Sequence, residues 1–283
     1  MCGKLYVVAT PIGNLADFSY RAVEILKNVD LIAAEDTRHV KMLLQHYAIN
    51  NKLVSVHQHN EEKVAPGLIE KIEQGLNIAL VSDAGTPLLS DPGMPFVKLA
   101  KQRGIEVSPI PGACALIAAL SVSGLPVTRF TFEGFLPRTS SARKAFFSKR
   151  ENDTATWVFY ESSHRILASL EDLAEIISID RRIVVARELT KIYETVVNDS
   201  LGNVVEQVKS NSNMQKGEFV VIVEGAVVEK NITEITEEQK RILLVLLKQC
   251  STKTAVAMAV EITGARKKVL YQAALDMVAN GNE

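Results

Sequence analysis

Short apolar segments alternate with amphipathic ones over residues 5–107 of the chain. Strand-like runs, rich in β-branched and other aliphatic residues, lie at residues 5–9, 31–34, 53–56, 78–81 and 105–107. Segments with the helical spacing of apolar residues lie at 21–27, 62–74 and 95–103. Strands separated by helices in this way predict a mainly parallel sheet with both faces covered.

The pattern changes at residues 122–126, where Gly124 and Pro126 lie close together and indicate a domain hinge. Strand-like segments then follow at residues 130–133, 156–160, 183–186, 195–197 and 219–223. Only two clear helices, at 166–177 and 204–209, separate them. We therefore expect an α/β fold with two α/β domains, a parallel-sheet domain over 1–121 and a mixed-sheet domain over 127–228.

The end of the chain, residues 236–283, is expected to be a separate helical tail. Helical spacing covers 237–249, 252–262 and 265–278, and Thr263 and Gly264 separate the last two segments. A helix, a short glycine-containing turn and a second helix predict a helix-turn-helix-like structure.

Composition limits the classes of protein that fit. The chain has 283 residues and a formal net charge of -1, so any RNA partner must be bound by local basic patches. Cys2, Cys114 and Cys250 form no Cys-x-x-Cys pair, which argues against a disulfide framework or a structural zinc site. The longest apolar run, 113–122, is too short to span a bilayer, and no signal peptide is visible. We expect a cytoplasmic protein with no membrane partner.

Several common site motifs are absent from the sequence. It contains no Gly-x-Gly-x-x-Gly, no phosphate-binding loop ending in Gly-Lys-Ser/Thr and no His-Glu-x-x-His. The histidines are scattered, and His57 and His59, the one close pair, have no further metal ligand beside them. We predict no metal site.

Four loops with glycine, proline or acidic residues follow predicted strands, at residues 10–15, 35–38, 82–93 and 109–115. Each loop taken alone is explained as a tight turn. In open parallel sheets, however, ligands bind beyond the carboxyl ends of the strands, and four such loops share that edge. Glycine and alanine also let a flat ligand approach the backbone closely. The four together favour a ligand cleft.

These four loops together resemble the tetrapyrrole-methylase superfamily. The resemblance extends over essentially the whole chain, including residues 133–138, 160–165, 187–191 and 217–219. It is strongest to the branch that methylates the ribose 2′-oxygen of a cytidine in the decoding region of 16S ribosomal RNA, cytidine 1402 in that family. It implies S-adenosyl-L-methionine as methyl donor, the small ribosomal subunit as partner, and a homodimer.

The resemblance also implies which residues bind the donor, in a cleft between the two α/β domains. Carried over to this sequence, they are Pro11, Ser82, Asp83, Leu88, Cys114, Ala115, Tyr160 and Gly217. Ser82-Asp83-Ala84 stands where many members of the superfamily have Gly-Asp-Pro.

A ribose hydroxyl is a weak nucleophile until it begins to lose its proton, so a positioned base is expected. Candidates are Lys191, Glu35, Asp36 and His57. Lys191 acts either as a base with a lowered pKa or as a cation that stabilises the forming alkoxide; the alternative is a solvated lysine or an ion pair with Glu194.

The segment Glu35-Asp36-Thr37-Arg38 has two interpretations of its own. It orients the ribose or the catalytic lysine, or it simply caps a helix N-terminus.

Residues 137–150 contain basic residues and no acid, and we expect them to bind RNA. The candidates are Arg138, Arg143, Lys144 and Arg150, with Phe135, Phe146 and Phe147 among them to stack on bases. The alternative is an amphipathic helix whose phenylalanines belong to the core. In the tail, Arg266-Lys267-Lys268 either contacts phosphates or is simply solvated.

Three functions are compatible with these features. The first is a methyltransferase acting on a ribose 2′-oxygen in small-subunit ribosomal RNA. The second is a small-molecule methylase of the same fold that acts on a tetrapyrrole precursor. The third is a non-catalytic RNA-binding protein that keeps the fold. The basic segment at 137–150 and the helical tail favour the first.

Overall fold

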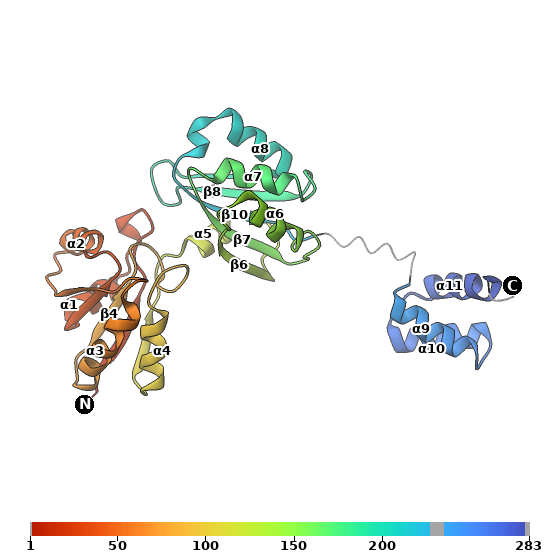
Figure 1. Cartoon of the computed structure of the whole chain (residues 1–283), viewed down its shortest axis with the longest axis horizontal. Coiled ribbons are helices and arrows are strands. Elements are labelled where there is room, and N and C mark those ends of the chain that lie inside the picture. The colour runs from red at the N-terminus through yellow and green to blue at the C-terminus, as the bar shows by residue number, and fades with distance from the viewer. Residues whose placement is uncertain (1, 227–234, 281–283) are drawn as a thin grey trace. The chain divides into compact units, whose positions relative to one another are not determined.

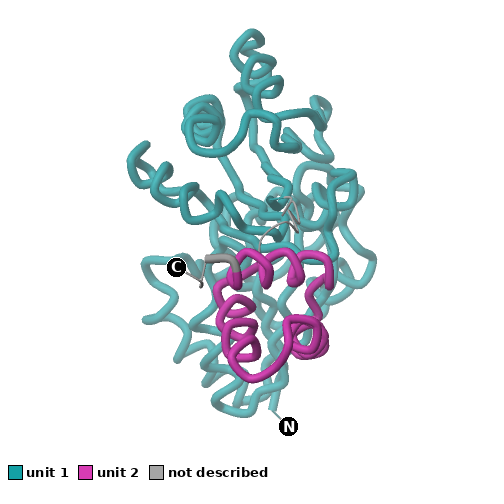
Figure 2. Tube along the Cα trace, turned by 90° about the vertical axis from the view of Figure 1, so that its right-hand side faces the viewer, with its two compact units in different colours: residues 1–226 teal, residues 227–283 magenta. Residues whose placement is uncertain are grey.

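The computed structural model describes residues 2–226 and 235–280. The chain divides into two compact units, Met1–Ala226 and Val227–Glu283, coloured teal and magenta in Figure 2. The larger unit contains two sheets (Figure 1). The predicted domain limits at residues 228 and 283 lie outside the described residues.

The first sheet is entirely parallel, with strand order β3-β2-β4-β1-β5. Its strands are β1 (Lys4–Val8), β2 (Leu31–Ala34), β3 (Leu53–Ser55), β4 (Ile78–Val81) and β5 (Glu106–Ile110). The helices that cover it are α1 (Tyr20–Asn28), α2 (Thr37–His46), α3 (Glu61–Glu73) and α4 (Met94–Gln102).

Both faces of this sheet are buried. On one face Leu26 of α1 and Leu43 of α2 pack against the strands, and on the other Ile69 of α3 and Phe96 of α4 do so. All of β4 is buried, as its uninterrupted apolar sequence indicates. The predicted parallel sheet with two covered faces is confirmed.

Since all five strands run in the same direction, their carboxyl ends meet at one edge of the sheet. The loops at 10–15, 35–38, 82–93 and 111–114 therefore leave the same edge, after β1, β2, β4 and β5. The last of them leads into α5 (Ala115–Val122), an apolar helix that continues toward the second sheet (Figure 1).

The second sheet is mixed, as the sequence predicts, and its strand order is β6-β7-β10-β8-β9. Only β6 and β7 pair in parallel; the other neighbours are antiparallel. The strands are β6 (Phe130–Phe135), β7 (Thr156–Ser162), β8 (Arg182–Arg187), β9 (Thr195–Ser200) and β10 (Glu218–Val223). The helices of this half are α6 (Ser140–Ser148), α7 (Ile166–Ala174) and α8 (Leu201–Ser210), with short 3-10 turns at Leu15–Asp17 and Ser212–Gln215 in the unit.

Alternating residues of β7 build two different cores. Trp157 and Phe159 point into the cluster covered by α6, α7 and α8. Val158 points to the opposite face, where it meets Leu116 and Leu120 of α5. The helix that leaves the first sheet thus packs on the second one, and this joins the two halves of the unit.

The smaller unit consists of α9 (Glu237–Leu247), α10 (Thr252–Thr263) and α11 (Lys267–Asn280). The three helices pack around Leu243, Val256 and Leu270. Gly264 ends α10 in a left-handed conformation (φ 65°), which produces the predicted turn before α11. Among the described residues, no helix is long and apolar enough to cross a membrane.

Candidate active site

A cavity of about 420 Å³ lies where the loops of the first sheet face β7 and β10 of the second. This volume is in the range of small-molecule sites. The first half contributes residues of the loops after β1, β4 and β5, including Ile12, Gly85 and Ala115. The second half contributes the ends of β7 and β10 and the segment after β8, including Ser162, Leu189 and Gly217.

Three of the four loops are fastened to one another. Thr10 and Gly85 exchange backbone hydrogen bonds of 2.8 and 3.0 Å, which joins the loops after β1 and β4. The hydroxyl of Thr86 donates to the carbonyl of Ala113 over 3.1 Å, which joins the loops after β4 and β5. One wall of the cavity is therefore a continuous backbone surface with small side chains.

The donor-binding residues implied by the family resemblance fall into two groups. Cys114, Ala115, Tyr160 and Gly217 line the cavity. Pro11, Ser82, Asp83 and Leu88 are not among its lining residues.

Ser82 and Asp83 instead shape the loop after β4. Ser82 is 1% exposed, and its hydroxyl donates to the carbonyls of Ala84 and Gly85 over 3.4 and 3.3 Å. The Oδ1 atom of Asp83 accepts the backbone N–H of Asp36 over 2.9 Å, which ties the loops after β4 and β2 together.

Tyr160 connects the two halves of the site. Its hydroxyl accepts the backbone N–H of Leu116 over 3.1 Å, and its ring meets Phe132 and Phe135 edge-on. Burial raises the pKa of Tyr160 to about 12, with a further contribution from Cys114. The phenol is therefore neutral at physiological pH and serves as a wall of the cavity.

Lys191 lies at the cavity between two carboxylates. Its Nζ is 2.8 Å from Oε1 of Glu188 and 2.9 Å from Oε2 of Glu218. Burial lowers the pKa of Lys191, but the two carboxylates outweigh it and the net pKa is raised. A general base needs a lowered pKa, so this geometry favours the second interpretation, a fixed cation. Glu194, which the alternative interpretation paired with Lys191, accepts the N–H of Thr190.

The loop that carries Lys191 is tightly constrained. Glu188 and Thr190 adopt left-handed conformations (φ 52° and 66°), which non-glycine residues rarely do. Gly13 lies against this loop so closely that a Cβ atom there would be 2.4 Å from Cγ of Lys191. Strain of this kind persists where a site requires one conformation.

Glu35, Asp36 and Arg38 do not line the cavity, and neither does His57. Asp36 is the N-cap of α2: its carboxylate accepts the N–H of Arg38 over 2.8 Å and pairs with the Arg38 guanidinium over 2.6 Å. These contacts hold the pKa of Asp36 well below its usual range. The helix-capping alternative therefore describes Asp36 and Arg38.

Glu35 differs from its neighbour. Burial, with added repulsion from Asp83 and Asp91, raises the pKa of Glu35 to about 7. It is thus part of a group of acids at the ends of β2 and β4.

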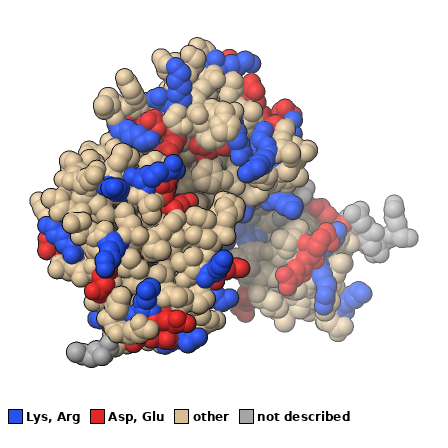
Figure 3. Space-filling view, turned by 60° about the vertical axis from the view of Figure 1, so that its left-hand side comes forward, with Lys and Arg blue, Asp and Glu red and all other residues tan. Residues whose placement is uncertain are grey.

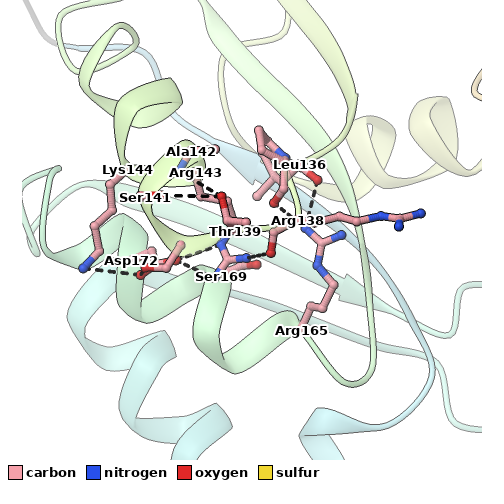
Figure 4. Close-up of polar contacts among 12 residues, drawn as sticks. Leu136, Arg138, Thr139, Ser141, Ala142, Arg143, Lys144, Arg165, Ser169 and Asp172 are labelled. Carbon is pink, nitrogen blue, oxygen red and sulfur yellow. Dashed lines mark hydrogen bonds and ion pairs between the residues drawn. The ribbon is translucent and has the colours of Figure 1, made fainter.

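The basic residues predicted to bind RNA have unequal positions (Figure 4). Arg143 is 5% exposed, and its guanidinium lies 2.6 Å from Asp172. Because it is buried in this ion pair, Arg143 is not part of an exposed surface that could bind RNA. Lys144 pairs with Glu175, and Arg150 pairs with Glu133, each over 2.6 Å.

Arg138 is the member of this group that extends away from the network in Figure 4, and it is exposed. Its backbone is fixed, because its carbonyl accepts the Arg143 guanidinium over 2.9 Å. Phe147 is fully buried and Phe146 packs on the same core, as the alternative predicted. Phe135, in contrast, is 57% exposed and lines the cavity.

Sequence reasoning singled out none of Asp91, His164 and Glu218, all of which line the cavity. Asp91 lies within the recognised loop, so its position was available from the pattern. The described residues contain no group of three or more His, Cys, Asp or Glu able to hold a metal ion.

The family model for Tetrapyrrole (Corrin/Porphyrin) Methylases matches residues 4–205, and the RsmI C-terminal HTH domain matches 233–277. Among solved structures, a cobalt precorrin-4 methyltransferase aligns with a TM-score of 0.57 at 15% identity, over 78% of this chain and 94% of that one. The uroporphyrin-III C-methyltransferase of Thermus thermophilus, solved with S-adenyl homocysteine, aligns with a TM-score of 0.51 at 18% identity, over 80% and 99%. Fold and site thus define the class, a methylase of the tetrapyrrole type.

Curated relatives cover nearly the whole chain. A protein of Escherichia coli O157:H7 is 48% identical over 97% of this chain and 95% of its own length. A protein of Xylella fastidiosa Temecula1 is 51% identical over 95% and 98%. Both are named ribosomal RNA small subunit methyltransferase I, and the chain belongs to this family.

Proposed function

We propose that this chain transfers a methyl group from S-adenosyl-L-methionine to a ribose 2′-oxygen, that of a cytidine in the decoding region of 16S ribosomal RNA. The observation that carries the proposal is identity of 48% over 97% of the chain to a protein named ribosomal RNA small subunit methyltransferase I. That similarity includes the helix-turn-helix domain as well as the cavity.

The cavity fits the methyl donor chemically. Gly85, Ala84 and Ala115 leave the backbone open to a flat ring, and Ile12 and Leu189 supply apolar surface. Asp91 and Glu218 supply negative charge that suits a cationic ligand. When bound, the donor supplies a methyl group already activated on a positively charged sulfur. The chain itself has to bind the ribose, exclude water and handle one proton.

Lys191 has the properties of an electrostatic stabiliser of that reaction. Its raised pKa keeps it charged, and Glu188 and Glu218 hold its Nζ in place. A fixed cation beside an oxygen that is losing its proton stabilises the developing negative charge. This supports a role in lowering the barrier to transfer, with the proton accepted elsewhere.

RNA binding is assigned to separate, local features. In Figure 3 both Lys/Arg and Asp/Glu atoms surround the hollowed face of the larger unit, so no single sign of charge covers it. Arg138 and Phe135 supply an exposed cation and an exposed ring near the cavity. Arg266, Lys267 and Lys268 are exposed at the start of α11. These positions support phosphate contacts and base stacking.

A homodimer belongs to the same proposal. Ile192 and Tyr193 are 94% and 71% exposed beside Lys191, which leaves two neighbouring large side chains open to a second copy of the chain. Sedimentation of the purified chain at micromolar concentration tests it: a mass near 31.0 kDa would contradict the dimer.

A tetrapyrrole precursor is the competing substrate, favoured by the names of the solved neighbours. However, the alignment with the precorrin-4 methyltransferase covers 94% of that protein but only 78% of this chain. About a fifth of this chain therefore has no counterpart in that methyltransferase. The helix-turn-helix domain, matched over residues 233–277 by its own family model, is suited to nucleic acid.

Transfer of a radiolabelled methyl group tests the substrate class. The purified chain is incubated with labelled donor and, in parallel, with unmodified small subunits, naked 16S RNA, large subunits or uroporphyrinogen III. We expect label in the small subunit and little in the large one. Label in uroporphyrinogen alone would contradict the proposal.

A further inference from the structure

Strand β6 contains one extra residue relative to its neighbour β7. The pairing runs from Phe132 opposite Val158 to Phe135 opposite Tyr160, so three steps along β6 match two along β7. Gly134, inside this stretch, has a left-handed φ of 65°, a conformation that glycine adopts without steric cost. Such an irregularity is a β-bulge, and bulges beside active sites redirect a side chain.

The side chain that this bulge redirects is that of Phe135. Phe132 and Phe135 are three residues apart, so regular alternation would place them on opposite faces of the sheet. Both rings instead meet the ring of Tyr160 edge-on, at centroid distances of 4.9 and 5.7 Å. Phe135 thus takes the position opposite Tyr160 that Gly134 would have in a regular strand, and it lines the cavity.

The backbone on both sides of Phe135 is held by partly buried arginines. Before it, the carboxylate of Glu133 accepts the Arg150 guanidinium over 2.6 Å. After it, the Arg165 guanidinium donates to the carbonyls of the next two residues, each over 2.9 Å (Figure 4). The ring therefore stands on a fixed segment of chain.

Among the phenylalanine and tyrosine rings that line the cavity in the described part of the chain, Phe135 is the most open. It is 57% exposed, whereas Phe219 is 2% exposed and Tyr160 is half-buried. An apolar ring in water costs free energy, so the unbound protein gains nothing from directing it outward. A flat ligand that covers the ring removes this cost.

The proposed substrate supplies a flat group of this kind. A nucleotide whose ribose enters the cavity has to leave the stack of its neighbours, and the lost stacking is a cost. An aromatic side chain replaces that stacking, because every base has a flat face. Stacking of one base on such a side chain strengthens binding roughly 10- to 100-fold.

Resting on the proposed function, we propose that Phe135 positions the target nucleotide: the base of the nucleotide that is methylated leaves its stack and lies on the Phe135 ring. The bulge at Gly134 turns the ring toward the base, and the ribose of the same nucleotide is thereby held at the cavity. Stacking uses a face that all bases share, so the identity of the base is recognised by other contacts.

Substitutions at Phe135 separate the ring from its apolar bulk. Phe135→Ala should lower kcat/KM on small subunits roughly 10- to 100-fold. Phe135→Tyr should retain most of the native value, and Phe135→Leu, which has no ring, should not. Stacking releases no counterions, so the salt dependence of kcat/KM should keep its slope in Phe135→Ala. Phe130→Ala is the matched control: it removes the same side chain from the same strand, 37% exposed and outside the cavity lining, and should retain native kcat/KM.

The bulge is tested by a combination of variants. Gly134→Ala puts a side chain in a left-handed conformation and should lower kcat/KM roughly tenfold by displacing the ring. Combined with Phe135→Ala it should add little further loss, because the ring is already absent. Gly104→Ala carries the same backbone cost (φ 70°) with nothing within 4 Å of the added Cβ, and should retain native kcat/KM. A full tenfold loss added in the double variant would contradict the role given to the bulge.

A photo-crosslink identifies the base directly. Protein with p-benzoylphenylalanine in place of Phe135 is irradiated with unmethylated small subunits and S-adenosylhomocysteine, and stops in reverse transcription locate the crosslinked nucleotide. Mass spectrometry of RNA treated with the wild-type protein locates the methylated one independently. We expect the two to be the same nucleotide. The photoreactive residue in place of Phe130 should give no crosslink there.

Three results would overturn the inference. The first is native kcat/KM in Phe135→Ala. The second is a crosslink to another nucleotide only, to a second copy of the chain, or to nothing. The third is loss of S-adenosylhomocysteine binding in Phe135→Ala, measured by calorimetry, which would assign the ring to the donor instead. Wild-type protein that leaves small subunits unmethylated would refute the proposed function itself, so the two failures are distinguishable.

Discussion

Gly13 and Lys191 are in direct contact across the site: a Cβ atom at position 13 would lie 2.4 Å from Cγ of Lys191. The loop after β1 thus supports the loop that carries the cation, and only a residue without a side chain leaves room for it. The same Cβ would lie 2.9 Å from Oγ1 of Thr190. A side chain at position 13 would therefore displace Thr190 together with Lys191.

Gly13→Ala should therefore push the loop at 188–191 away from the cavity. Because small displacements of a positioned group are costly, kcat/KM should fall roughly 10- to 100-fold. Gly67→Ala is the matched control. It lies inside α3 with nothing within 4 Å of the added Cβ, and should stabilise the protein by about 0.5–1 kcal/mol. Equal kcat/KM values in the two variants would show that the contact between Gly13 and Lys191 is not needed for activity.

Lys191→Ala should reduce kcat by about 100-fold, because it removes a fixed charge from the developing oxyanion. The affinity for S-adenosylhomocysteine, measured by calorimetry, should change little. Since the folded pKa of Lys191 is raised above 10.5, its ion pairs stabilise the fold below that pH and are lost only as pH rises through the folded pKa. If the activity of the wild-type protein fell between pH 7 and 9 because Lys191 lost its proton, these contacts would be contradicted.

Arg143→Ala should destabilise the larger unit by about 3 kcal/mol, because the buried Asp172 carboxylate loses its closest cation and keeps only the Lys144 amine, 3.6 Å away, and the Ser140 hydroxyl. Denaturant unfolding measures this. Arg138→Ala, five residues away and exposed, should leave stability unchanged. It should instead weaken RNA binding and lower the slope of its salt dependence by about 1. If the two variants exchanged these effects, the interpretation of Figure 4 would be wrong.

Glu35→Gln should raise stability above pH 7 and leave it unchanged at pH 4. The folded pKa of Glu35 is raised from 4.5 to about 7, so its contribution is complete below pH 4.5 and is lost as pH rises through 7. After allowance for solvent screening, the gain at pH 8 should be about 1 kcal/mol. Melting temperatures of both proteins at pH 4 and pH 8 measure it; a difference at pH 4 only would contradict the assignment.

Ending the chain at Ala226 should leave a folded protein, since the clusters of the larger unit contain only its own residues. It should bind S-adenosylhomocysteine normally and methylate small subunits roughly tenfold less well, because the exposed basic residues of α11 are gone. In the full chain, Lys267→Glu combined with Lys268→Glu should reproduce part of this loss. If the truncated protein bound small ribosomal subunits as tightly as the full chain does, the helix-turn-helix domain would have no role in RNA binding.

The parts of this fold that the sequence predicted are those coded locally. The apolar runs that form β4 and most of β7 need only neighbouring residues to be recognised. The start of α2 was expected only as one of two interpretations of Glu35–Arg38, because the helix follows β2 directly and Asp36 and Arg38 carry functional as well as capping signals. Resemblance to a family located four of its expected donor-site residues on the cavity.

The remaining site features depend on pairs of residues distant in sequence. The alternative interpretation of Lys191 was an ion pair with Glu194, but Glu188 and Glu218, the latter 27 residues away, pair with it. Arg143 was predicted to bind RNA, whereas its guanidinium donates to the carboxylate of Asp172, 29 residues away. Composition and spacing carry no information on such pairings.

The most direct measurement uses S-adenosylmethionine with a trideuterated methyl group and unmodified small subunits. After incubation with wild-type protein, the RNA is digested to nucleosides and separated by liquid chromatography with mass spectrometry. We predict the deuterated mass increment in 2′-O-methylcytidine, on the ribose fragment. The same increment on the cytosine base, or no labelled nucleoside, would contradict ribose methylation.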